Sequence, residues 1–272
     1  MNTFKKTTTA ALCALFTACA SVNSPAAKNT EGRQGWQWKT VNSVITIPLY
    51  PGQEGAEPGI RLEYRLLDLA GSEKEAQTVR KLLYDGGSPE KYRDKSGEAL
   101  RNEYHGMRKN AETYPGMSDG PLNWHYTEVV ERGAESPRYA VIRRSKDYYL
   151  GGAHGMRETE YFLIGRDEAG RIPLRELLRE GAEAALLRLA GNEIRRYFDI
   201  PEGRPLSDVL FDNELEMQDN FFLSAGGLGF HWDPYEIAPY SAGPVELSVP
   251  WAQCADLLSE KGLRIMADFG FH

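Results

Sequence analysis

The chain has 272 residues, of which 41% are hydrophobic and 26% charged, and its formal net charge is −7 at pH 7. This length allows one large domain or two small ones, each with its own core. An acidic chain argues against a nucleic-acid partner, because phosphate backbones are bound by clusters of Lys and Arg. The same charge is compatible with a basic protein partner.

The N-terminus has the pattern of an export signal. Two lysines precede an apolar stretch at residues 10–18, so residues 1–18 are typical of a signal peptide and too short for a final membrane span. Ala18 is a small residue directly before Cys19, which is the pattern of a lipoprotein signal. We therefore predict that Cys19 is lipidated and anchors the protein to a membrane surface. An ordinary signal peptide, cleaved after small residues, is the alternative.

The predicted processing changes the charge and the cysteine content of the chain. Removal of the signal peptide takes away two of the 32 basic residues and none of the 39 acidic ones, which gives a formal charge of −9. With Cys19 acylated, Cys254 is the only cysteine left, so no intramolecular disulfide is expected. Residues 19–35 are small and polar and are predicted to be a flexible tether, with order beginning near Trp36.

Residues 36–140 are predicted to form a first module of strands and helices. Strand patterns, either β-branched runs or alternating apolar residues, occur at residues 41–49, 60–69, 124–131 and 138–144. The last two strands flank a short turn and are expected to pair as a hairpin. Helices are expected at residues 73–84 and from Pro89 toward Arg108.

Residues 141–272 are predicted to form a second module. Strands are expected at residues 158–164, within 221–232 as two short strands meeting at Gly226 and Gly227, at 245–249 and at a final edge, 264–267. Helical spacing of apolar residues predicts helices at residues 174–198 and 250–262. Cys254 falls on the apolar face of the second helix and is expected to be a buried, inert thiol. Locally paired strands with separate helices indicate an α+β fold, mostly antiparallel, with two abutting modules.

The motif LGGAHG, residues 150–155, joins two predicted strands. Its glycines, Gly151, Gly152 and Gly155, permit positive φ and close backbone approach, which favours a tight connection. His154 in this connection is either a structural or binding residue, or a general base or metal ligand. The sequence has no HExxH, HxH or CxxC pattern, so no metal and no cofactor are predicted.

The stretch HWDPYEIAPYSAG, residues 231–243, combines aromatic, acidic and proline residues. Asp followed by Pro favours a turn, so one interpretation is a structured loop whose aromatic side chains pack inward. The other is an exposed interface, because Tyr and Trp supply large contact area with few rotamers. The candidate binding residues are His154, Trp232, Asp233, Tyr235, Glu236 and Tyr240.

An enzymatic alternative uses the same side chains. His154 with Asp233 or Glu236 could serve a cell-wall hydrolase or a deacetylase-like enzyme, and the two carboxylates could form an acid–base pair. Spacing within a proline-flanked loop does not establish that geometry. The one GxSxG pattern, at residues 116–120, lies in a predicted loop and not between a strand and a helix as a nucleophile elbow would, and there is no Walker loop. We predict no catalytic residues and a binding role.

Two motifs together resemble the extracytoplasmic domain of the RsiV-type anti-sigma factors. They are YYLGGAHG and FFLSAGGLGFHWDPYEIAPYSAGPVELSVPW, separated by a strand, a turn and a Leu-rich helix. The resemblance runs from Val41 to Met266 and is strongest from Tyr139 to Leu258. It implies an α+β fold of two modules and a receptor role without chemistry, since RsiV-type domains bind lysozyme. Relatives include a domain attached to a peptidoglycan deacetylase.

The expected protein is an exported, membrane-anchored lipoprotein of the bacterial cell envelope. Its partners are expected to be the membrane, through the lipid anchor, and a basic protein such as lysozyme or a peptidoglycan-related ligand. Because the chain shows neither a cytoplasmic sigma-binding segment nor a transmembrane helix, anti-sigma signalling is not expected.

Overall fold

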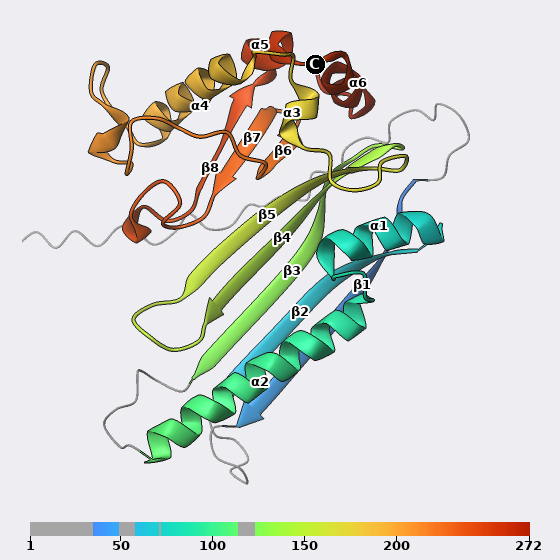
Figure 1. Ribbon diagram of the computed structural model, residues 1–272, viewed down its shortest axis with the longest axis vertical. Coiled ribbons are helices and arrows are strands. Elements are labelled where there is room, and N and C mark those ends of the chain that lie inside the picture. Colours follow the sequence, from blue (N-terminus) through green and yellow to red (C-terminus); the bar gives the residue numbers. More distant parts are fainter. Residues whose placement is uncertain (1–34, 49–57, 71, 114–122) are drawn as a thin grey trace, which may run out of the picture. The chain divides into compact units, whose positions relative to one another are not determined.

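The computed structural model describes residues 35–48, 58–70, 72–113 and 123–272. All of them lie in one compact unit, residues 32–272. The predicted signal peptide, Cys19 and nearly all of the tether fall outside the described residues and stay predictions. The described part of the chain has two sheets of mostly antiparallel strands and a set of helices, which confirms the α+β fold (Figure 1). No helix in this part is both long and apolar enough to cross a bilayer.

A five-stranded sheet forms the larger layer. Its strands follow the chain order and are β1 (Gln37–Pro48), β2 (Pro58–Ala70), β3 (Trp124–Glu135), β4 (Tyr139–Tyr149) and β5 (Met156–Gly165). Neighbouring strands are antiparallel except β2 and β3, which are parallel. Parallel neighbours need a crossover connection, and two helices lie in the chain between them. The predicted hairpin is confirmed as β3 and β4.

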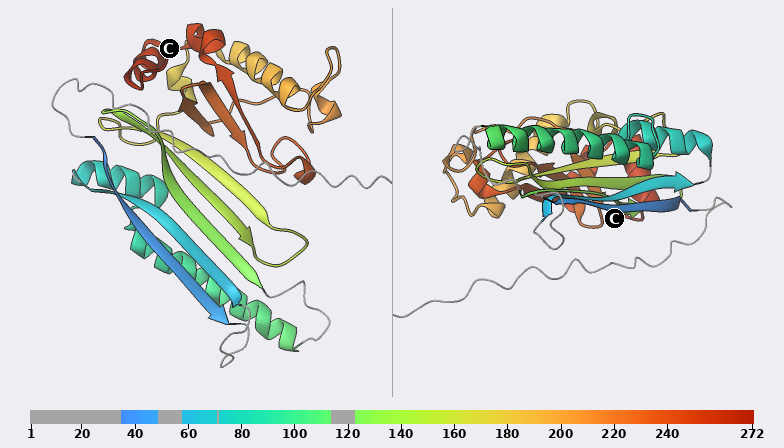
Figure 2. Two further views of the ribbon diagram at one scale, coloured as in Figure 1. Left: turned by 180° about the vertical axis from the view of Figure 1, so that it is seen from behind. Right: turned by 90° about the horizontal axis from the view of Figure 1, so that it is seen from below.

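Two helices, α1 (Glu73–Leu83) and α2 (Pro89–Thr113), cover one face of this sheet beside β1 to β3 (Figure 2). On β2, the alternate residues Ile60, Leu62 and Leu66 point to that face and are 0% exposed. This alternation follows from the two-residue period of a strand. The opposite face is polar over much of its area and carries ion pairs such as Arg143–Glu131, 2.9 Å.

A three-stranded antiparallel sheet forms the smaller layer. Its strands are β6 (Phe221–Ser224), β7 (Gly227–Trp232) and β8 (Val245–Pro250), and the first two confirm the pair predicted within residues 221–232. Its helices are α3 (Leu174–Leu177), α4 (Glu183–Tyr197), α5 (Trp251–Cys254) and α6 (Glu260–Asp268), with 3-10 turns η1 (Leu206–Asp208), η2 (Tyr240–Ala242) and η3 (Ala255–Leu257). Cys254 is fully buried there, and burial raises the pKa of its thiol to about 11.

Three predicted elements are wrong. The single helix at 250–262 is divided into α5, the 3-10 turn η3 and the start of α6, with an extended Leu258 between η3 and α6. The single helix at 174–198 is interrupted between α3 and α4, where Gly181 has a φ of +75° that other residues rarely adopt. The edge strand at 264–267 is instead part of α6. The Ser259 side chain caps α6 by accepting from the Gly262 amide, and Ile265 is buried against the core. A short apolar run does not distinguish strand from helix, and the cap decides in favour of the helix.

The two layers have separate cores that meet at β5. Phe162 and Ile164 belong to the core beneath α1 and α2, whereas Tyr161 and Leu163 belong to the core of the smaller sheet. The presence of two sheets, each with its own core, is consistent with the two predicted modules. The boundary predicted between residues 140 and 141 falls inside β4, and the exact limits of the modules stay a prediction.

Candidate functional site

The connection at residues 150–155 links β4 to β5. Gly151 and Gly152 have φ of +89° and +86°, a left-handed conformation that glycine adopts without strain. At Gly155 an added Cβ would lie 2.9 Å from the carbonyl oxygen of Tyr148. The Tyr149 hydroxyl donates to the Gly152 carbonyl at 2.9 Å and holds the loop against its strand. The glycines therefore build a tight strand connection.

His154 projects from this connection and meets the distant loop at residues 233–243. Its Nδ1 lies 2.9 Å from the Gly155 carbonyl, and its Nε2 lies 3.2 Å from the hydroxyl of Tyr235. Its ring stacks on Tyr240 with centroids 3.9 Å apart. The Tyr240 hydroxyl in turn donates to the Gly155 carbonyl at 2.7 Å. We call His154, Tyr235 and Tyr240 the stacked-loop surface.

Tyr235 stands at the tip of its loop in an unusual backbone conformation. Its φ is +74°, rare for a residue with a Cβ, and its side chain is 49% exposed. Asp233 and Glu236 close the turn beneath it: the Glu236 amide donates to the Asp233 carbonyl at 3.1 Å, and the Asp233 amide donates to the Glu236 carboxylate at 2.7 Å. Such conformations persist only where the surroundings fix them, and they concentrate at functional sites.

The other three candidate residues are not part of the stacked-loop surface. Trp232 is 5% exposed and stacks on Phe230 in the core, as the inward-packing interpretation of its loop expects. Asp233 points toward β5, where its Oδ1 accepts from the Thr159 amide at 2.8 Å. Glu236 is exposed and serves the turn. The structure thus unites half of the predicted binding set.

The enzymatic alternative pairs His154 with Asp233 or Glu236, and within the described chain the structure shows no hydrogen bond between His154 and either carboxylate. The hydrogen bonds of His154 go to Gly155 and Tyr235, whereas the Asp233 carboxylate bonds the Thr159 amide and a different histidine, His231. The described residues also hold no group of three or more potential metal ligands.

Sequence reasoning missed His231, which lies on β7 and has a side chain that is 5% exposed. Its Nε2 is 3.0 Å from Asp233 Oδ1 and its Nδ1 is 3.0 Å from Glu246 Oε2, while the Tyr161 hydroxyl donates to Glu246 at 2.9 Å. We call these four residues the His231 cluster. Both ring nitrogens face carboxylates, an arrangement that suits the imidazolium form.

The cluster shifts the pKa values of His231 and Glu246. Burial by itself lowers the pKa of His231, but its hydrogen bonds to Asp233 and Glu246 outweigh that effect and raise the pKa above the ordinary 6.5. Burial raises the pKa of Glu246, yet the bonds from His231 and Tyr161 bring it below 4.5. His231 and Glu246 are direct cross-strand partners on β7 and β8, so the strand register, and not a local sequence pattern, brings the cluster together.

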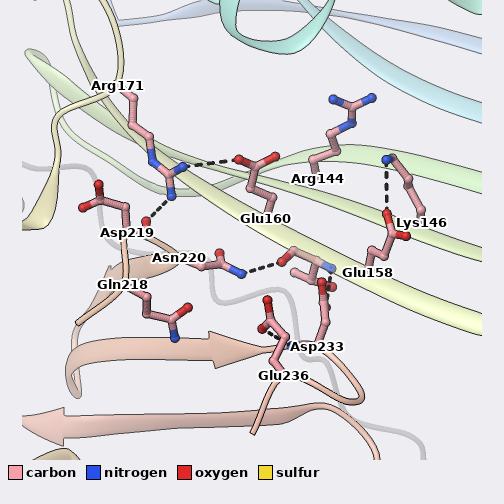
Figure 3. A pocket seen from close by; sticks show the side chains of 11 residues that line it. Arg144, Lys146, Glu158, Glu160, Arg171, Gln218, Asp219, Asn220, Asp233 and Glu236 are labelled. Atoms are coloured by element: carbon pink, nitrogen blue, oxygen red, sulfur yellow. Dashed lines mark hydrogen bonds and ion pairs between the residues drawn. The ribbon is translucent and has the colours of Figure 1, made fainter. Parts of the chain in front are cut away.

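A charged cleft of about 380 Å³ lies between β4–β5 and the segments 218–220 and 233–236 (Figure 3). Ion pairs cross its wall, Lys146 with Glu158 and Arg171 with Glu160, both at 3.2 Å. Beside them, Asn220 hydrogen-bonds the β5 backbone: it donates to the Thr159 carbonyl at 2.7 Å and accepts from the Tyr161 amide at 2.9 Å. Polar side chains thereby satisfy the outer edge of β5.

A second cleft, of about 680 Å³, adjoins the stacked-loop surface. One wall is the open face of the larger sheet, with His125, Asp147, Tyr149 and Arg157, and the other wall is the segment 240–244. Tyr149 stacks on His125, and Arg157 donates to Asp147 at 2.6 Å. The cleft thus combines flat aromatic rings with a charged pair.

Comparisons with known proteins agree with this fold. Residues 175–252 match a family described as "Protein of unknown function (DUF3298)". This segment holds the loop with Tyr235 and Tyr240 but not His154. No curated protein matches the chain.

Two solved structures of that family resemble the chain. One, from Bacteroides fragilis, has 17% identity and a TM-score of 0.71, and the alignment covers 86% of this chain and 97% of that one. The other, from Pseudomonas aeruginosa, has 16% identity and a TM-score of 0.54, with 84% and 96% covered. At such identities the similarity shows a shared fold.

Proposed function

We propose that this protein is a non-catalytic binding domain of an exported envelope lipoprotein, which holds a macromolecular partner on the stacked-loop surface. The observation that carries the proposal is the meeting of His154 and Tyr235, which are 81 residues apart in the chain. Their two loops fix three rings at the surface through hydrogen bonds and stacking. A preorganised surface loses little entropy on binding, and exposed tyrosines are frequent centres of interfaces.

Lysozyme is the leading partner. The resemblance to RsiV-type domains points to it, and a DUF3298 segment in the second half of the chain is consistent with that relationship. The acidic chain, −7 overall and −9 after the predicted processing, suits a strongly basic protein. Complementary charge accelerates encounter and selects partners more than it adds affinity.

A peptidoglycan-related ligand is the second candidate, favoured by the cleft beside the surface. Tyr149 and Tyr240 lie on opposite walls of this cleft, and the charged pair of Asp147 and Arg157 lies in it. Flat rings can stack on the apolar faces of sugars, while charged side chains can bond their polar groups.

Calorimetry of the compact unit, residues 32–272, against a C-type lysozyme tests the first candidate. At about 0.15 M salt, where exposed charges are screened beyond about 8 Å, specific binding should persist. Replacing Tyr235 by alanine should weaken it at least about ten-fold, since a central tyrosine often dominates an interface. Tyr197→Ala is the matched control, because Tyr197 is 48% exposed against 49% for Tyr235 and lies on α4.

The outcomes separate the candidates. Equal weakening by the Tyr197 variant, or no heat at about 100 μM protein, removes lysozyme, since a weaker affinity would not serve a receptor. Soluble peptidoglycan fragments then replace lysozyme in the same titration, with the same two variants. Turnover of peptidoglycan that is lost in His154→Gln would overturn the non-catalytic proposal.

The lipid anchor is proposed on the pattern before Cys19 alone. Metabolic labelling with a palmitate analogue should mark the wild-type protein and not Cys19→Ser. Equal labelling of both would leave an ordinary signal peptide.

A further inference from the structure

A groove of about 810 Å³ lies on the smaller module, apart from the stacked-loop surface. Half-buried apolar side chains, Leu215, Met217 and Ile237, line it together with the buried Trp232. Phe211 also lines the groove, and its side chain is 52% exposed, the second highest value among large apolar residues of the described chain. The groove therefore offers apolar contact area that no described residue covers.

Acidic residues surround this apolar lining. Asp212, Glu214 and Glu216 alternate with Asn213 and Leu215 along the segment, and all three acids are exposed. The groove residues include no Lys, Arg or His, and within the described chain none of these three carboxylates forms an ion pair. We call the surface formed by residues 210–218 with Trp232, Glu236 and Ile237 the acidic groove.

The unpaired acids of the groove contrast with the charged residues on the face of the larger sheet opposite α1 and α2. There, Glu131 pairs with both Arg65 and Arg143, and Asp147 pairs with Arg157. Charges on that face are balanced within the molecule. In the acidic groove the like charges repel one another, and no lining residue supplies the opposite charge.

The segment is held in place although it has little regular structure. The Phe211 amide donates to the Ile237 carbonyl at 2.9 Å, and the Ser207 amide donates to Asn213 Oδ1 at 2.9 Å. At its far end the Gln218 side chain donates to the His231 carbonyl at 3.0 Å. These anchors fix the shape of the groove before any partner arrives, which reduces the entropy lost on docking.

We propose that the acidic groove docks a cationic, amphipathic segment of a partner protein. An apolar side chain of the segment packs against Phe211, Leu215 and Met217, while its Lys or Arg side chains meet Asp212, Glu214 and Glu216. Charge selects this occupant. A second copy of this chain carries a net charge of −7, and a nucleic acid is also anionic, so both are repelled. The groove shares no residue with the stacked-loop surface, so the inference stands whether or not lysozyme binds.

The test measures fluorescence anisotropy of a labelled amphipathic Lys/Leu peptide with the protein, residues 32–272, at about 0.15 M salt. A Glu/Leu peptide of the same length reports adhesion to apolar surface alone. Asp212→Asn/Glu214→Gln/Glu216→Gln should weaken Lys/Leu binding about ten-fold, from three exposed charge contacts of modest strength each. Phe211→Ser should weaken it about three- to ten-fold through lost apolar contact.

A control triple variant distinguishes an effect of the groove charges from an effect of the net charge of the protein. Glu98→Gln/Glu103→Gln/Glu180→Gln removes the same number of charges from exposed positions on α2 and before α4. It should change the affinity less than about two-fold, because charges farther away than a Debye length are screened. Unchanged thermal unfolding of every variant confirms that each is folded.

Three results would overturn the proposal. Equal weakening by the control triple variant would show attraction to the whole acidic surface. Equal binding of the Glu/Leu peptide would show adhesion without charge selection. Loss of Lys/Leu peptide binding in Tyr235→Ala, but not in the groove variants, would show that the peptide binds the stacked-loop surface instead. The lysozyme titration tests that surface independently.

Discussion

Replacing His231 by glutamine is expected to destabilise the protein most at mildly acidic pH. In the wild type, the imidazolium of His231 donates to Asp233 and Glu246 at 3.0 Å each. Glutamine removes the cation and leaves the two carboxylates facing one another. Because Asp233 also bonds the β5 backbone, the loss affects the junction between the two sheets.

The size of the effect follows from burial. Removing one partner from a fully buried ion pair costs about 3–5 kcal/mol. The side chains of Asp233 and Glu246 are 21% and 44% exposed, so solvent screens the Glu246 carboxylate in particular. We therefore expect the variant to lose about 2 kcal/mol of unfolding free energy at about pH 6.

The pH dependence has a definite sign. The pKa of His231 is raised above 6.5, so its contribution to stability is complete below about pH 6.5 and is lost as the pH rises through the folded pKa. The pKa of Glu246 is lowered below 4.5, so its contribution is present above that value and is lost as the pH falls through the folded pKa. The His231 cluster is most stabilising between these limits.

Urea unfolding of both proteins at about pH 6 and about pH 9 measures the difference. The loss in the variant should fall from about 2 kcal/mol at the lower pH to below about 1 kcal/mol at the higher pH. His105→Gln, at an exposed position on α2, should change stability by less than about 0.5 kcal/mol. An equal loss for His231→Gln at both pH values would refute the argument, because a neutral packing role has no such dependence.

Two further variants test the cores. Glu128→Gln should lower the free energy of unfolding by about 3 kcal/mol, measured by urea unfolding. The fully buried carboxylate binds Arg144 at 2.7 Å, and in the variant the guanidinium loses its counter-charge. A loss below about 1 kcal/mol would contradict this argument. Gly227→Ala should lower the melting temperature sharply, since the new Cβ would lie 2.1 Å from a backbone oxygen of β8, whereas Gly170→Ala, with nothing within 4 Å, should change it little. Equal shifts in the two alanine variants would show that close approach is not the cause.

Local patterns were sufficient to predict most of the strands. The alternation on β2 and the turn between β3 and β4 are short-range features, and the structure confirms both. The errors lie where short-range features compete: Gly181 divides a long apolar periodicity, and the Ser259 cap makes a helix of a run that also fits a strand. Tertiary contacts decide such segments, and single-sequence patterns do not contain them.

The candidate site was predictable as a set of residues and not as an arrangement. The glycines around His154 indicated a strand connection, and the aromatic loop indicated an interface. That Tyr235 and Tyr240 lie against His154 depends on how the smaller sheet packs on β5, which no local pattern encodes. His231 was missed because a lone histidine in an apolar strand resembles an ordinary core residue. Its role depends on the register that places Glu246 opposite.

The docking of the two modules explains why the binding loop can be rigid without regular structure. Side chains from the smaller module, Asn220 and Asp233, replace a neighbouring strand along the outer edge of β5. If the modules separated, these two side chains would lose their hydrogen-bond partners, and so would the backbone groups of Thr159 and Tyr161. Because all of these bonds would break together, the contact favours all-or-none docking. Asp233 also begins the turn that carries Tyr235, so the bond that joins the modules also positions the stacked-loop surface. A partner that binds both His154 and Tyr235 therefore binds only the docked arrangement, and its binding energy stabilises the junction between the sheets.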